Sequence, residues 1–261
     1  MLVGNSPTIK EVLDEVACAS RSDAKTLITG ESGVGKEVVA NLIHHESRRR
    51  NAPFVAINCA GIPDSLLESE LFGHMRGSFT DAHRDKIGWI ERANHGTIFL
   101  DEIGEMSGRM QAALLRFLEN GEIQRVGSER GRATVDVRII AATNRDLSAR
   151  IAGNQFREDL YYRLNVIRIA IPPLRERAED VLPLIEYFIR ISSETHRVAQ
   201  PVLDGAALAK LVAYQWPGNV RELKNVIERL VVRANSGTIM ASDLPSEILG
   251  DWRHPPSRSR R

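Results

Sequence analysis

The sequence predicts an α/β fold, with a parallel five-stranded sheet between helices and a small all-α part after it. Two observations predict this fold. Short apolar runs alternate with helical patterns through about residue 171, which is typical of a parallel sheet covered on both faces. Pro172 and Pro173 then break the alternation, and the residues after them carry helical patterns to about Gly250.

The expected elements follow one another along the chain. A helix from Thr8 to about Ser20 is expected because Ser6 suits the N-cap and Pro7 the first helical position. The expected strands are Thr26–Thr29, Phe54–Asn58, Ile98–Asp101, Val137–Thr143 and Val166–Ala170. The later helices are expected at Glu37–His44, Leu182–Ile191, Gly205–Tyr214 and Val220–Val232. The apolar face of the helix at residues 37–44 would consist of Val38, Val39, Leu42 and Ile43.

This order predicts an α/β region at residues 1–171, a smaller helical region at 172–250 and a tail at 251–261. The tail is rich in proline and arginine, and we expect it to be disordered or a linker. The chain has 261 residues, 43% of them hydrophobic and 26% charged, as in ordinary globular proteins. Its net charge of +1 gives no general electrostatic reason to bind nucleic acid or a membrane.

The cysteine content and the N-terminus indicate a cytoplasmic protein. Cys18 and Cys59 are too few for a disulfide framework and too far apart for a metal-binding motif, so a reducing compartment is expected. The N-terminal residues lack the basic and apolar regions of a signal peptide. No apolar run approaches the length of a transmembrane helix.

A glycine-rich motif lies between the first expected strand and the next helix. It fits G-x-x-x-x-G-K, the loop whose backbone N–H groups hold phosphates while its lysine reaches the β- and γ-phosphates. The strand–loop–helix order puts the phosphates at a helix N-terminus, which favours anions. Glu37 stands where the general motif has a Ser or Thr hydroxyl for the metal, so Mg²⁺ would depend more on Asp101, water and the nucleotide. The candidate residues are Gly30, Glu31, Ser32, Gly33, Val34, Gly35, Lys36 and Glu37.

Two adjacent carboxylates, Asp101 and Glu102, end the apolar run that begins at Thr97. One carboxylate can hold Mg²⁺, and the other can polarise a water toward the γ-phosphate. The run alone is equally consistent with an ordinary strand and a solvated turn. Together with the glycine-rich loop, it predicts binding and hydrolysis of a nucleoside triphosphate.

Four further polar residues are candidates for nucleotide sensing. Asn144 follows a strand and could sense the γ-phosphate, although asparagine there is commonly a turn residue. Arg157 and Arg163 could reach a neighbouring subunit's phosphate, or could pair with nearby surface carboxylates. Arg221 could approach the phosphates when the helical part closes.

Five segments resemble signatures of the sigma-54-dependent transcriptional activators, the NtrC-type bacterial enhancer-binding proteins. The resemblance is to their central AAA+ ATPase domain and extends from about Val3 to Gly250. The segments are Glu70–His74, Gly77–Ala82, Phe156–Leu164, Pro172–Arg177 and Trp216–Leu223. The Gly-Lys-Glu ending of the phosphate loop also fits this family.

The resemblance implies ATP and Mg²⁺ as ligands. Lys36 and the loop from Gly30 would hold the ATP phosphates, Asp101 would hold Mg²⁺ and Glu102 would activate water. Asn58 resembles the residue that switches Glu102 in and out of its active orientation, which an amide can do by hydrogen bonding a carboxylate.

The resemblance also implies roles for the sensing residues. Asn144 resembles the first sensor of the family and Arg221 the second. Arg157 and Arg163 resemble its trans-acting arginines. These roles imply a homo-hexamer or heptamer ring with ATP between subunits.

The family's hallmark loop, commonly Gly-Ala-Phe-Thr-Gly-Ala, contacts sigma-54 and its RNA polymerase holoenzyme and drives closed promoter complexes to open ones. Here the loop consists of Gly77, Ser78, Phe79, Thr80, Asp81 and Ala82. Asp81 replaces a flexible glycine and adds a negative charge, and Met75 replaces a common glutamate. These departures put the contact with sigma-54 in question rather than ATP hydrolysis.

Three functions are therefore compared. The first is an ATP-hydrolysing remodeller of sigma-54 RNA polymerase that activates transcription. The second is a nucleotide-gated interaction module whose altered loop does not engage sigma-54. The third, a kinase for a small molecule, lacks a recognisable acceptor site.

The resemblance is limited to the family's central domain. We find no sensory domain ahead of it and no helix-turn-helix pattern after Leu249. The chain could be an excised central domain or a natural short form. We expect no sequence-specific DNA binding by this chain alone.

Overall fold

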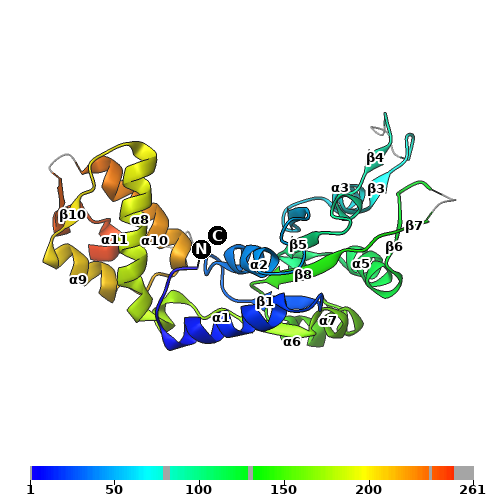
Figure 1. Cartoon of the computed structure of the whole chain (residues 1–261), viewed down its shortest axis with the longest axis horizontal. Coiled ribbons are helices and arrows are strands. Elements are labelled where there is room, and N and C mark those ends of the chain that lie inside the picture. Colours follow the sequence, from blue (N-terminus) through cyan, green and yellow to red (C-terminus); the bar gives the residue numbers. More distant parts are fainter. Residues whose placement is uncertain (1, 79–82, 129–131, 235–236, 250–261) are drawn as a thin grey trace, which may run out of the picture. The chain divides into compact units, whose positions relative to one another are not determined.

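The computed structural model describes residues 2–78, 83–128, 132–234 and 237–249. The chain divides into two compact units (Figure 1). The first unit consists of Met1–Leu2, Lys10–Glu31 and Gly35–Ile171. The second unit consists of Val3–Ile9, Ser32–Val34 and Pro172–Arg261. Residues 32–34, in the middle of the glycine-rich loop, therefore group with the second unit.

A five-stranded sheet forms the centre of the first unit, and its order is β2-β5-β8-β1-β9. All neighbouring strands are parallel, which confirms the predicted fold class. The strands are β1 (Thr26–Thr29), β2 (Phe54–Asn58), β5 (Thr97–Asp101), β8 (Arg138–Thr143) and β9 (Ile167–Ala170). Their carboxyl ends meet at one edge of the sheet. The glycine-rich loop follows β1 at this edge, and the two adjacent carboxylates stand at the end of β5.

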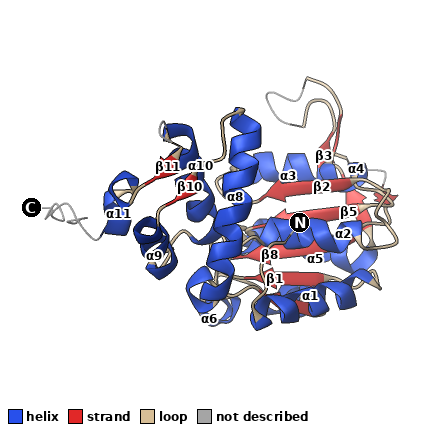
Figure 2. Cartoon of the chain, turned by 60° about the vertical axis from the view of Figure 1, so that its left-hand side comes forward, coloured by secondary structure: helices blue, strands red, loops and turns tan. Residues whose placement is uncertain are grey.

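Helices cover both faces of this sheet (Figure 2). They are α1 (Pro7–Ser20), α2 (Lys36–His45), α3 (Asp64–Phe72), α4 (Trp89–Arg92), α5 (Gly108–Asn120), α6 (Leu147–Ala152) and α7 (Glu158–Leu164). The start of α1 is capped as predicted, since Ser6 Oγ accepts a hydrogen bond from Ile9 N (3.3 Å). The predicted apolar face of α2 is wrong at Val38, which is 38% exposed, whereas Val39 and Ile43 are buried.

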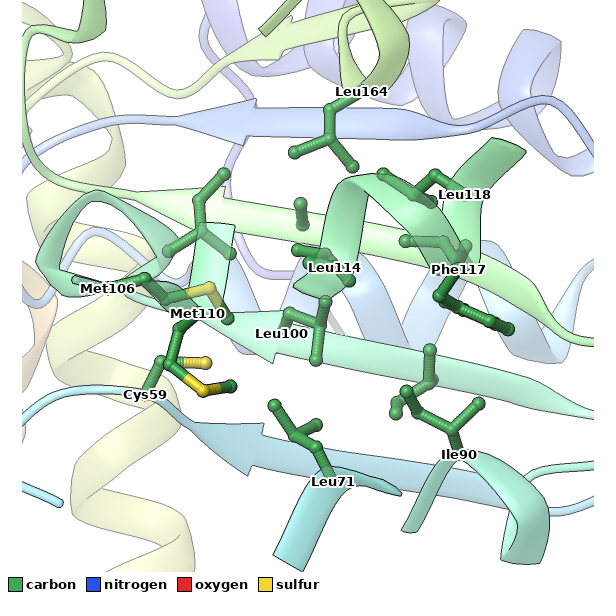
Figure 3. Packing of buried hydrophobic residues seen from close by; sticks show 14 of the residues in the cluster. Cys59, Leu71, Ile90, Leu100, Met106, Met110, Leu114, Phe117, Leu118 and Leu164 are labelled. Atoms are coloured by element: carbon green, nitrogen blue, oxygen red, sulfur yellow. The ribbon is translucent and has the colours of Figure 1, made fainter. Parts of the chain in front are cut away.

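Alternate residues of the central strands pack on opposite faces, as the two-residue period of a strand requires. On one face, Leu100 packs with Met110, Leu114 and Phe117 of α5 in the main core of the unit (Figure 3). The neighbouring residue Phe99 is buried outside this cluster, and α2 contacts β1, β5 and β8. Near the carboxyl ends of the strands, Cys59 lies with Met106 and Met110 (Figure 3).

Two small antiparallel pairs were not predicted. They consist of β3 (Gly73–His74) with β4 (Lys86–Ile87), and β6 (Glu122–Gln124) with β7 (Arg132–Thr134). The two pairs are joined through Val126, whose N donates to Gly73 O (2.9 Å) and whose O accepts from Met75 N (3.0 Å). Of the predicted sigma-54 loop, Gly77 and Ser78 belong to the described residues. Phe79, Thr80, Asp81 and Ala82 lie outside them.

The second unit is mainly helical, as predicted. Its helices are α8 (Val181–His196), α9 (Gly205–Ala213), α10 (Asn219–Arg233) and α11 (Ser246–Leu249), with short 3₁₀ turns η2 (Leu174–Glu176), η3 (Ala178–Asp180) and η4 (Ala241–Asp243). The fully buried Trp216 lies in its core and donates from Nε1 to Leu211 O (3.0 Å). A short parallel pair, β10 (Val202–Leu203) and β11 (Thr238–Ile239), was not predicted.

The N-terminal segment is fixed to the second unit through Asp180, which is fully buried. The Asp180 carboxylate accepts hydrogen bonds from Asn5 N (2.6 Å), Ser6 N (2.8 Å) and Ser6 Oγ (2.7 Å). Three donors compensate the burial of this charge. Among the described residues, no helix is long and apolar enough to cross a bilayer.

Candidate functional site

The glycine-rich loop joins β1 to α2 with backbone conformations that favour glycine. Gly33 has a φ of 81° and Gly35 a φ of 109°, both in the left-handed region. Gly33 also leaves no room for a side chain, because a Cβ there would lie 2.4 Å from Gly218 O. Gly35 is the N-cap of α2, so Lys36 is the first residue of the helix.

The Lys36 ammonium lies inside this loop. Its side chain is 6% exposed, and Nζ donates to Gly30 O (3.1 Å) and Glu31 O (3.2 Å). It also lies 3.5 Å from Glu102 Oε1, which joins the loop to the end of β5. The loop carbonyls therefore orient the lysine before any phosphate is bound.

Glu102 connects three strand ends. Its Oε1 faces Lys36, and its Oε2 accepts a hydrogen bond from Asn144 N (3.1 Å), directly after β8. The Glu102 backbone has a φ of 56° and a ψ of 43°, a left-handed conformation uncommon for a residue other than glycine. Such outliers persist where the surrounding structure holds them, and they occur often at functional sites.

Asp101 lies next to Glu102 and accepts a hydrogen bond from its backbone N at Oδ1 (3.0 Å). Burial, followed by the nearby negative charge of Glu102, raises the pKa of Asp101 above its usual range, while Lys36 opposes this shift. Two crowded carboxylates are a favourable environment for a divalent cation, because the cation compensates their repulsion. Carboxylate oxygen is also a preferred ligand of Mg²⁺, so the residues present fit this ion.

Asn58 is the last residue of β2, the strand beside β5, and Cys59 follows it. Asn58 is in register with Asp101, and its Oδ1 accepts a hydrogen bond from Ala60 N (2.8 Å). The Cys59 N donates to Asp101 O (2.9 Å). Burial, with the charges of Asp101 and Glu102, raises the pKa of the Cys59 thiol to about 12, so this cysteine is an unreactive packing residue.

The arginines of α7 do not meet Lys36 or Glu102 through any described hydrogen bond or ion pair. Arg157 pairs with Asp159 at the start of the helix, with Nη2 2.6 Å from Oδ2 and Nε 3.0 Å from Oδ1. This pair is half-exposed and can exchange partners at small cost. Arg163 is exposed. Burial lowers the pKa of Lys25, and the nearby positive charge of Arg163 lowers it further.

Arg221 lies at the start of α10 in the second unit, which includes the loop residues 32–34. Its Nη1 donates to Ser32 Oγ (2.9 Å), and its backbone N donates to Gly33 O (3.2 Å). The structure therefore brings Arg221 to the glycine-rich loop.

Comparison with known protein families finds a match for most of the chain. The sequence pattern of the sigma-54 interaction domain matches residues 2–170, and that of the AAA+ ATPase lid domain matches residues 175–260. The chain belongs to the sigma-54 interaction domain family. This confirms the predicted family.

Relatives of this sigma-54 interaction domain are bacterial regulators. The regulatory protein AtoC of Escherichia coli (strain K12) is 50% identical over 248 residues, which are 95% of this chain and 53% of that protein. The Nif-specific regulatory protein of Klebsiella pneumoniae is 52% identical over 238 residues, 91% of this chain and 45% of that protein. The chain thus spans about half the length of the curated relatives it matches.

Solved structures share the fold of this sigma-54 interaction domain. NtrX from Brucella abortus in complex with ATP superposes with a TM-score of 0.87 at 37% identity, covering 95% of this chain and 57% of that one. NtrX in complex with ADP gives the same TM-score and identity, covering 95% of this chain and 56% of that one.

Two loop-contacting residues in the part of the chain that matches the AAA+ lid domain were not among the predicted site residues. Asn219 Nδ2 donates to Ser32 O (3.1 Å), and Arg177 Nη2 donates to Val34 O (3.1 Å). Both residues lie within the segments on which the family resemblance was based, and this resemblance was the signal that could have identified them. Their contacts with the loop depend on tertiary structure and have no local pattern.

Proposed function

We propose that this domain binds ATP with Mg²⁺, hydrolyses it to ADP and phosphate, and uses the energy to remodel sigma-54 RNA polymerase. The observation that carries the proposal is the convergence of Lys36 Nζ, the Glu102 carboxylate and Asn144 N at the carboxyl ends of β1, β5 and β8. A cation for phosphate and a carboxylate for water are two of the groups that enzymes use in triphosphate hydrolysis, together with a metal ion. The ATP and ADP complexes of NtrX support the choice of nucleotide.

In this proposal, the loop from Gly30 to Glu37 holds the phosphates. Lys36 exchanges its hydrogen bonds to the loop carbonyls for hydrogen bonds to the β- and γ-phosphates. Glu102 then leaves Lys36 and orients the attacking water, accepting its proton. Asp101 holds Mg²⁺. When bound, Mg²⁺ would neutralise charge on the phosphate oxygens.

The other site residues act in sensing and assembly. Asn144 and Arg221 sense the γ-phosphate, and Asn58 controls the orientation of Glu102. Arg157 and Arg163 reach the nucleotide of a neighbouring subunit in a hexamer or heptamer ring. The half-exposed Arg157–Asp159 pair supports this role, since it leaves the guanidinium accessible to a partner.

The partner of the ring is sigma-54 within its polymerase, which the loop Gly77–Ala82 contacts through Phe79 and Thr80. Closed promoter complexes are thereby converted to open ones, in the cytoplasm and without sequence-specific DNA binding by this chain. Asp81 favours a second candidate, a nucleotide-gated module that no longer engages sigma-54, because it adds a charge to each loop.

The proposal is tested by capture of purified sigma-54 with ADP–aluminium fluoride, compared with ADP alone. The fluoride complex mimics the transferring phosphoryl group, so capture that depends on it supports remodelling. The Lys36→Ala variant is the control that cannot retain the nucleotide. Absence of capture by a chain that hydrolyses ATP would contradict the proposal, and rescue by Asp81→Gly would then support the second candidate.

A further inference from the structure

Three consecutive carbonyl groups of the phosphate loop accept hydrogen bonds within the second unit. Ser32 O accepts from Asn219 Nδ2 (3.1 Å), Gly33 O from Arg221 N (3.2 Å) and Val34 O from Arg177 Nη2 (3.1 Å). The middle of the loop is thus held at every peptide group from residue 32 to residue 34.

These contacts also determine the direction of the loop N–H groups. In a trans peptide, the carbonyl of one residue and the N–H of the next point in opposite directions from the same plane. Fixing the carbonyls of residues 32–34 therefore fixes the N–H groups of Gly33, Val34 and Gly35. These N–H groups are the part of the motif that binds phosphate.

Asn219 is suited to this task by its backbone and by its second hydrogen bond. It is fully buried and has a φ of 54°, a conformation that asparagine adopts more easily than most residues. Its Oδ1 accepts a hydrogen bond from Leu174 N (2.8 Å), which orients the amide so that Nδ2 faces Ser32 O.

Arg177 provides the second contact from a separate segment. It is 2% exposed, and its Nη2 donates to Val34 O, directly before the N-cap of α2. The two side chains therefore hold the loop from either side of Gly33.

We propose that Asn219 and Arg177 are positioning residues that preset the N–H groups of the loop for the nucleotide phosphates. They act on phosphate through the peptide groups of Ser32 and Val34. This inference rests on the proposed binding of ATP. A site already shaped before binding loses less entropy on binding, so the contacts should appear as nucleotide affinity.

The test measures the dissociation constant for MgADP by titration calorimetry in variants of the full chain. Asn219→Asp keeps the acceptor for Leu174 N but removes the donor to Ser32 O. Asn219→Gly removes both the acceptor and the donor, adds no charge and tolerates the positive φ of this position. Arg177→Met removes the other donor, and Arg177→Lys retains one. Val226→Ala, in the core of the second unit, is the matched control for general loosening.

We expect about a tenfold weaker MgADP affinity for Asn219→Asp, Asn219→Gly and Arg177→Met, with partial recovery in Arg177→Lys. Val226→Ala should lower the melting temperature but leave the affinity unchanged. Unchanged affinity in the first three variants would overturn the inference, as would equal weakening in Val226→Ala. If the unaltered chain bound no MgADP, the proposed function would fall as well.

Discussion

At the scale of single residues, Glu102 is the most unusual group of the site. Its backbone is left-handed, and its carboxylate lies between the Lys36 ammonium and Asn144 N. The carboxylate and the phosphates of ATP would compete for the same lysine. Nucleotide binding should therefore release Glu102 toward water.

Glu102→Ala should separate binding from turnover. We expect ATP to bind at least as tightly, because Lys36 and the loop are unchanged and the competing carboxylate is removed. We expect kcat to fall at least about a hundredfold with loss of the base. Steady-state phosphate release and calorimetry measure the two effects. Glu105→Gln, which changes a surface carboxylate paired with Arg145, is the control. Normal turnover by Glu102→Ala would exclude Glu102 as the base.

Asp101→Asn should stabilise the chain at neutral pH in the absence of Mg²⁺ and nucleotide. The raised pKa of Asp101 means that its contribution to stability is fully present below its ordinary unfolded pKa. The contribution is lost as pH rises through the folded pKa, so the ionised group destabilises the fold at pH 7. We expect Tm to rise by about 2–4 °C at pH 7 and to change little below pH ~3.9.

The pH dependence separates this effect from a general change in packing. Thermal melts at both pH values should be compared with those of Asp14→Asn, which removes an exposed carboxylate from α1. Equal effects of Asp101→Asn at the two pH values would show that ionisation is not the cause.

The sequence was sufficient to predict the types of group in the site but not all of their contacts. The loop and the pair Asp101–Glu102 have local patterns, because each stands at the end of a strand. The contact of Lys36 with Glu102 could be expected only in general terms, since it requires β1 and β5 to be placed in one sheet. Asn219 and Arg177 lie more than a hundred residues away from the loop in the sequence, so no local pattern predicts their contacts with it.

At the scale of elements, α5 connects the site to the small strand pairs. It begins after Glu102 and η1 (Ile103–Glu105), and it ends at Asn120, with Gly121 as its C-cap directly before β6. Ser107 caps its N-terminus by accepting a hydrogen bond from Met110 N (3.3 Å). Gly121, with a φ of 67°, ends it in a left-handed conformation.

Ser107→Ala should lower the free energy of unfolding by about 1 kcal/mol, the usual value of an N-cap side chain. Denaturant titration measures this loss. Ser107→Asn is the matched variant, since asparagine also caps helices, and it should recover most of the stability. Equal destabilisation by both variants would show that the cap contributes little here.

The main strands were predictable because each is a short apolar run between turn or helix signals, and their predicted ends agree with the structure to within one residue. The order β2-β5-β8-β1-β9 was not predictable, since it is set by crossovers and not by local sequence. The pairs β3–β4, β6–β7 and β10–β11 consist of only two or three residues per strand. Such lengths are too short to show a period.

At the scale of the whole molecule, the proposed ring predicts that ATP hydrolysis depends on neighbouring subunits. A mixture of Arg157→Ala and Lys36→Ala chains should recover part of the ATPase activity that each lacks alone. In hybrid interfaces, an intact Lys36 and an intact Arg157 would meet at one nucleotide. Phosphate release across mixing ratios measures this effect. No recovery in assembled mixtures would argue that Arg157 acts within its own subunit or not at all.

The anchoring of Asn5 and Ser6 by Asp180 limits how this chain can be dissected. A fragment that begins at Pro172 would retain Asp180 but lose all three hydrogen bonds that compensate its burial. Hydrogen bonds to a charged group contribute about 1.5–3 kcal/mol each, so such a fragment should fold poorly. Trimming the chain through Ser6 would lose the same three hydrogen bonds, so an N-terminal deletion should destabilise the helical unit although the residues removed lie more than 170 positions before Asp180.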